Sequence, residues 1–105
     1  MSDPRLEQFQ AMVQEFPDSP MGHFSLGKLH LERRAYPEAA RSLEEATRLD
    51  PTYAAALVSL GDAYSGAGDV VRAREVLGRA HALALAQSHP SLAEEIDERL
   101  GELED

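Results

Sequence analysis

Residues 57–80 read LVSLGDAYSGAGDVVRAREVLGRA, and residues 23–46, 34 positions earlier, read HFSLGKLHLERRAYPEAARSLEEA. Small residues and leucines recur between the two stretches at helical spacing. A small residue on one helix lets the backbone of a neighbour approach, and leucines fill the remaining gaps. The pattern therefore predicts two copies of a unit made of two closely packed helices. The shift aligns Ser25 with Ser59, Leu26 with Leu60, Gly27 with Gly61, Ala39 with Ala73, Leu43 with Leu77, Ala46 with Ala80 and Leu49 with Leu83.

These positions also carry a family resemblance. The first copy resembles the tetratricopeptide repeat signature, and the second copy, with Leu57 in the place of the signature's tryptophan, is closer to it. The resemblance covers residues 20–87. It implies an all-α helix-turn-helix solenoid of about six antiparallel helices, stacked with a right-handed superhelical twist. The matching residues are Leu26, Gly27, His30, Ala39, Leu43, Ala46 and Pro51, and then Leu57, Leu60, Gly61, Tyr64, Ala73, Leu77 and Ala80.

Turn-forming residues divide the chain, which we expect to be a single domain over residues 1–105. We expect an N-terminal packing helix at 3–16, repeat 1 at 20–53, repeat 2 at 54–87 and an acidic C-terminal capping helix at 90–104. Within repeat 2 the leading helix is expected at about 54–66, and the trailing helix is expected to continue to about Gln87.

Short polar motifs mark the expected helix ends and surface pairs. Asp3, Thr52 and Asp69 are expected helix N-caps. The run Ser88-His89-Pro90-Ser91, followed by Glu94, signals the start of the last helix. The spacings of Glu44 with Arg48 and of Glu75 with Arg79 favour ion pairs on helix surfaces.

Composition and motifs argue against several classes of function. The formal charge is −9, and residues 88–105 carry seven acids against Arg99, a balance that opposes nucleic acid and anionic membranes. The chain has no cysteine and no long apolar run, so we expect a cytoplasmic protein with no membrane span. His23, His30, His81 and His89 form no metal-binding motif. We therefore expect no metal, no cofactor and no enzymatic activity.

The resemblance implies a binding surface, because in this family the leading helix of each repeat lines a concave groove that holds a peptide or helix. This groove is largely apolar, which disfavours the lysine and asparagine clamp that some members use for a C-terminal carboxylate. We expect a protein-interaction adaptor that binds an apolar segment of a partner protein. The alternatives are a homodimer formed through the same apolar faces, or a groove covered by the chain's own N-terminal helix. The groove residues are Met21, Phe24, Lys28, Leu31, Ala55, Val58, Asp62 and Ser65.

Overall fold

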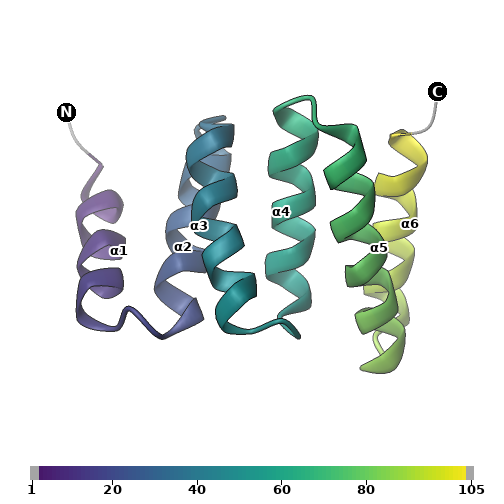
Figure 1. The fold of residues 1–105 in the computed structure, drawn as a ribbon, viewed down its shortest axis with the longest axis horizontal. Coiled ribbons are helices and arrows are strands. Elements are labelled where there is room, and N and C mark those ends of the chain that lie inside the picture. Colours follow the sequence, from purple (N-terminus) through teal and green to yellow (C-terminus); the bar gives the residue numbers. More distant parts are fainter. Residues whose placement is uncertain (1–2, 104–105) are drawn as a thin grey trace.

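The computed structural model of the chain describes residues 3–103, which contain six helices and no strand (Figure 1). The helices stand side by side in chain order and alternate in direction, so the predicted all-α tetratricopeptide-type solenoid is confirmed. The last position of the expected capping helix, Glu104, lies outside the described residues, as does Asp105. The helices are α1 (Pro4–Glu15), α2 (Pro20–Glu32), α3 (Tyr36–Leu49), α4 (Ala54–Gly66), α5 (Val70–Ala86) and α6 (Pro90–Glu102).

Two of the three expected N-caps form. Asp3 Oδ1 accepts a hydrogen bond of 2.9 Å from the Arg5 amide, and Asp69 Oδ1 accepts one of 3.1 Å from the Arg72 amide. The expectation for Thr52 is wrong, because its amide and hydroxyl both donate to Asp50 Oδ1, at 3.0 and 2.8 Å. Thr52 therefore closes the turn before α4, and no side chain caps that helix.

The start of α6 also differs from the expected motif. The helix begins at Pro90, as the sequence predicts, but the N-cap residue His89 makes no side-chain capping bond. Proline is favoured in the first turn because its missing N–H would lack a partner there and its φ is already helical. Proline rather than a hydrogen-bonded capping box accounts for this start.

Three helices end in the same way, with one residue in the left-handed conformation. The φ angles are 59° at Arg34, 84° at Gly68 and 59° at Ser88. After each of them, the next amide donates back to a carbonyl five residues earlier, for example Asp69 to Tyr64 at 2.9 Å. Glycine adopts this conformation without strain, whereas the Cβ of other residues disfavours it. Arg34, which stands 34 residues before Gly68, therefore occupies a glycine position.

The core is built on the repeated contact that the aligned glycines and leucines predict. A Cβ at Gly27 would lie 2.6 Å from Leu43 Cγ, and a Cβ at Gly61 would lie 2.6 Å from Leu77 Cγ. Both leucines are fully buried, in a cluster that runs through α3, α4 and α5 and reaches Ile96 of α6. Glycine is required at both places because the leucine occupies the space that a side chain would take.

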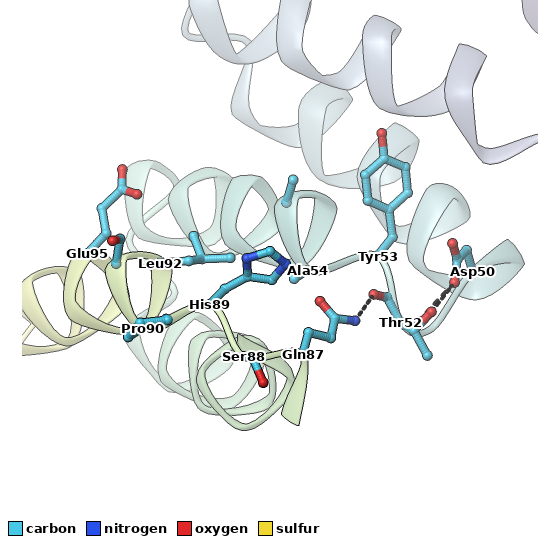
Figure 2. Close-up of a pocket in the computed structure, with 12 residues that line it drawn as sticks. Asp50, Thr52, Tyr53, Ala54, Gln87, Ser88, His89, Pro90, Leu92 and Glu95 are labelled. Carbon is cyan, nitrogen blue, oxygen red and sulfur yellow. Dashed lines mark hydrogen bonds between the residues drawn. The ribbon is translucent and has the colours of Figure 1, made fainter. Parts of the chain in front are cut away.

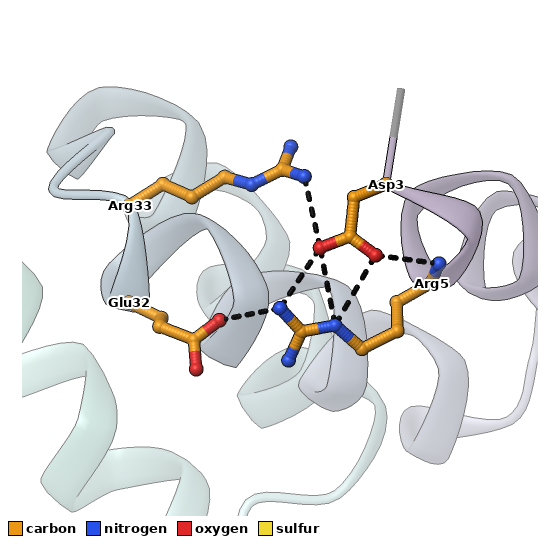
Figure 3. A network of polar contacts seen from close by, with 4 residues as sticks. All are labelled: Asp3, Arg5, Glu32 and Arg33. Carbon is orange, nitrogen blue, oxygen red and sulfur yellow. Dashed lines mark hydrogen bonds and ion pairs between the residues drawn. The ribbon is translucent and has the colours of Figure 1, made fainter. Parts of the chain in front are cut away.

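The first helix is held differently from the others. It contains no buried residue, and its apolar stripe is only partly covered by α2. Arg5 links the two helices: its Nη2 lies 2.8 Å from Asp3 Oδ2 and 2.8 Å from Glu32 Oε2 (Figure 3). Arg33 also pairs with Asp3, at 3.1 Å. These arginines and the capping bond hold the pKa of Asp3 down, at about 2.

The expected ion pairs on the trailing helices do not form. Arg48 pairs with Glu45 instead of Glu44, and Glu44 accepts a hydrogen bond from the Tyr64 hydroxyl. Within residues 3–103, Glu75 and Arg79 form no ion pair. Spacing brings such side chains within reach of each other, but a partner on the neighbouring helix can compete for one of them, as Tyr64 does for Glu44.

Candidate functional site

A concave hollow of about 360 Å³ lies between the leading helices α2 and α4 and the last helix α6. Each of the three helices contributes both apolar and polar side chains to its lining, and apolar atoms form the larger part of the surface. The hollow brings together six of the eight residues that the sequence predicts for a groove: Phe24, Lys28, Leu31, Ala55, Val58 and Asp62.

The other two predicted residues lie outside this hollow. Met21 stands in the first turn of α2 and is 62% exposed. Ser65 stands in the last turn of α4 and is exposed. Both occupy the expected helix face, but they lie at opposite ends of the helices, beyond the lining of the hollow.

Besides Ser59 of α4, sequence reasoning missed the part of the hollow that helix α6 supplies, namely Leu92, Glu95 and Arg99. These residues lie 37 positions after Ala55, Val58 and Asp62, so α6 presents the same face as a third leading helix. A shift of 34 does not reveal this, because α5 has 17 residues whereas α3 has 14. The signal that could have found this face is the helical spacing of Leu92, Glu95 and Arg99, which are three and four residues apart along α6.

An ion pair closes one end of the hollow. Arg99 Nε donates to Asp62 Oδ1 at 2.9 Å, and Arg99 Nη1 lies 3.4 Å from Glu95 Oε1. The side chains of Arg99 and Asp62 are about one-third exposed, at 30% and 34%. The pair therefore joins α6 to α4 at one end of the hollow, and Asp62 is already paired with a cation of the same chain.

The aromatic side of the hollow is formed by Phe24. Its ring lies 4.8 Å from the ring of Tyr53, centroid to centroid, at an angle of 39°. The ammonium of Lys28 lies 5.6 Å from the centroid of the same ring, on the exposed side of α2. Contacts with a second ring and with a cation favour a fixed position of the Phe24 ring, which offers an apolar surface for an incoming side chain.

The hollow continues at both sides. Between α1 and α2 a space of about 490 Å³ shares Phe24, Lys28 and Leu31 with it. At the loops before α4 and α6 a larger space of about 650 Å³ shares Ala55, Leu92 and Glu95 (Figure 2). Here Gln87 Nε2 donates to the Thr52 carbonyl at 3.1 Å and ties the two loops together. We call these three connected spaces the groove.

The N-terminal helix does not cover the centre of this groove. The residues that line the hollow come from α2, α4 and α6, and none of the described residues of α1 is among them. Helix α1 instead forms one wall of the groove through Arg5 and Phe9. The hollow is therefore open: Ala55 is exposed and Phe24, Leu31 and Leu92 are partly exposed, whereas Val58 lies at its base and is 8% exposed.

Two of the four histidines make polar contacts within the fold. His23 Nε2 lies 3.1 Å from the Pro17 carbonyl oxygen, and His81 Nε2 lies 3.1 Å from Asp97 Oδ1 between α5 and α6. Across residues 3–103, no group of three or more His, Asp or Glu side chains is placed to hold a metal ion. In the same part of the chain, no helix combines the length and apolar character needed to cross a membrane.

The antiparallel helix pairs and their recurring contacts define a helical-repeat protein. Two family models described as tetratricopeptide repeat match the chain, one over residues 30–89 and the other over residues 5–54. The chain therefore belongs to the tetratricopeptide repeat family. No curated protein matches it.

Solved structures share the fold over almost the whole chain. The solution structure of protein BPP2914 from Bordetella parapertussis is 29% identical, with a TM-score of 0.83 over 98% of this chain and 89% of that one. PcrH in complex with the chaperone binding region of PopD is 22% identical, with a TM-score of 0.87 over 93% and 74%. The TPR2B domain of yeast Sti1 in complex with pHsp70 is 20% identical, with a TM-score of 0.88 over 93% and 78%.

Proposed function

We propose that this protein is an adaptor that binds an apolar helix or extended segment of a partner protein in the groove formed by α2, α4 and α6. The observation that carries the proposal is the accessible hollow itself, in which the side chains of Phe24, Leu31, Val58 and Leu92 meet and no described residue of α1 intrudes. A concave, mostly apolar surface with a few polar groups is the usual form of a binding site.

Two of the similar structures support this use of the fold. PcrH is in complex with a region of PopD, and the Sti1 domain is in complex with pHsp70. The clamp for a C-terminal carboxylate is not the mechanism that we propose here. Arg99 is already paired with Asp62, so Lys28 is the one cation lining the central hollow that has no ion pair within residues 3–103, and a single ammonium does not make a carboxylate clamp.

The affinity of the groove should come from a small apolar anchor. The central hollow has a volume of about 360 Å³, which is in the lower part of the range for small binding sites. A few well-packed, desolvated contacts carry most of the energy of such interfaces. We therefore expect one or two apolar side chains of the partner to occupy the space beside Phe24 and Val58.

The test is a selection of random displayed peptides on the purified chain, followed by binding measurements with Ala55→Gln. Ala55 is exposed within the hollow, so glutamine fills the space without removing a core contact. Ala82→Gln is the matched control, because Ala82 is an exposed helical alanine of α5 that does not line the groove. We expect the selected peptides to carry apolar side chains, to lose affinity for Ala55→Gln and to keep it for Ala82→Gln.

Two results would contradict the proposal. If the selected peptides bound Ala55→Gln as tightly as the wild type, they would not occupy the hollow. If light scattering showed a stable dimer that Ala55→Gln converted to a monomer, the occupant would be a second copy of the chain, which is the homodimer alternative.

A further inference from the structure

The charged side chains that line the groove are distributed unevenly along its length. Toward the C-terminal ends of α2 and α4, away from the loops that precede α4 and α6, the groove contains Lys28 and the paired side chains of Asp62 and Arg99. The end of the groove at those two loops is called the loop end. At the loop end, the lining includes two carboxylates, Asp50 and Glu95. None of the described residues that line this loop end is a lysine or an arginine.

The two carboxylates lie on opposite sides of the loop-end hollow, with His89 and Tyr53 between them (Figure 2). Asp50 uses Oδ1 to accept both bonds from Thr52, and its Oδ2 has no hydrogen-bond partner within residues 3–103. The Glu95 side chain is 58% exposed, and its contact with Arg99 is long, at 3.4 Å. Both groups therefore keep capacity to accept hydrogen bonds from a cationic ligand.

We propose that the preferred partner is a peptide segment with an apolar anchor followed, on the side of the loops, by lysine or arginine. The anchor occupies the hollow beside Phe24 and Val58, and the basic side chain reaches Asp50 or Glu95. This inference rests on the proposed function, since it names the chemistry of the segment that the groove binds. Complementary charge at the edge of an interface selects partners and speeds association more than it adds affinity.

The orientation of the bound segment follows from the positive charge of Lys28 at the opposite end of the groove. Lys28 lies over the Phe24 ring and forms no ion pair within residues 3–103. A basic partner residue placed there would meet a like charge, which is unfavourable at an interface. The basic side chain therefore lies on the loop side of the anchor.

The selected peptides provide the test, because their sequences report charge preference directly. We expect enrichment of lysine or arginine on one side of the apolar anchor. In titration calorimetry with such a peptide, the double variant Asp50→Asn/Glu95→Gln should weaken binding about three- to ten-fold, with a smaller effect at high salt. Asparagine keeps the oxygen that Thr52 needs. Glu94→Gln, an exposed neighbour outside the groove, should leave binding unchanged.

The outcomes separate this inference from the proposed function. If the selected peptides lose binding to Ala55→Gln but show no basic preference, or bind the double variant as tightly as the wild type, the groove stands and the charge inference is wrong. If they bind Ala55→Gln normally, both proposals are wrong. Acidic residues in place of basic ones beside the anchor would also overturn the inference.

Discussion

Replacing Gly61 with alanine should destabilise the protein, whereas the same change at Gly78 should stabilise it. Both glycines lie inside helices, where alanine is favoured by about 1 kcal/mol when nothing else changes. At Gly78 an added Cβ meets no atom within 4 Å. At Gly61 the Cβ would lie 2.6 Å from Leu77 Cγ and 2.7 Å from Leu77 Cδ2.

Leu77 has little freedom to move away, because it is only 1% exposed. Overpacking of this kind costs about 1–3 kcal/mol, which exceeds the gain in helix propensity over most of that range. We therefore expect a net loss of up to about 2 kcal/mol for Gly61→Ala and a gain of up to about 1 kcal/mol for Gly78→Ala.

Thermal unfolding of the two variants measures the difference. A change of 1 kcal/mol moves the Tm of a domain of this size by about 4–8 °C, so the variants should move in opposite directions from the wild type. Urea unfolding with unchanged slope would show that the variants differ in stability alone. A Tm for Gly61→Ala that rises as much as that of Gly78→Ala would refute the close approach of α4 to α5.

Three further variants test local features. Arg34→Gly should raise the free energy of unfolding by up to about 1 kcal/mol, because the backbone of Arg34 is in the left-handed conformation (φ 59°), which glycine adopts without strain. A lower Tm would contradict this. Asp3→Ala should lower the Tm near neutral pH. Because the pKa of Asp3 falls from 3.8 to about 2 on folding, the difference from wild type should shrink as the pH falls from about 4 to 2; a constant difference would be contrary evidence. Burial, and to a lesser extent the contact with Glu44, raise the pKa of Tyr64 to about 12. Glu44→Gln should therefore lower the pKa of Tyr64 in an absorbance titration. The stabilisation that comes from this raised pKa is lost as the pH rises from about 10 to 12.

The fold was predictable because it depends on contacts that recur in the sequence. Gly27 meets Leu43 as Gly61 meets Leu77, so the period of 34 reports a real packing unit. Helix starts were predictable where a side chain of the preceding residue caps the helix, as at Asp3 and Asp69. The prediction for Thr52 failed because residue type alone does not show that Asp50 is a competing acceptor two residues away.

The candidate groove was predictable in part, for a related reason. The faces of α2 and α4 follow from the repeat, and six of the eight residues predicted on them line one hollow. The contribution of α6 did not follow from it, because the three additional residues of α5 move α6 out of register with the period. The pairing of Arg99 with Asp62 joins residues 37 positions apart, and only the packed structure shows that they meet.

The most direct test of the groove is a map of backbone amide chemical shifts during titration with a selected peptide. We predict that the largest changes fall on the residues around the central hollow in α2, α4 and α6, including Phe24, Ala55 and Leu92, with small changes at Val71 and Ala82 on the exposed surface of α5. Changes concentrated on that surface of α5, with the hollow unaffected, would contradict the assignment of the groove as the binding site.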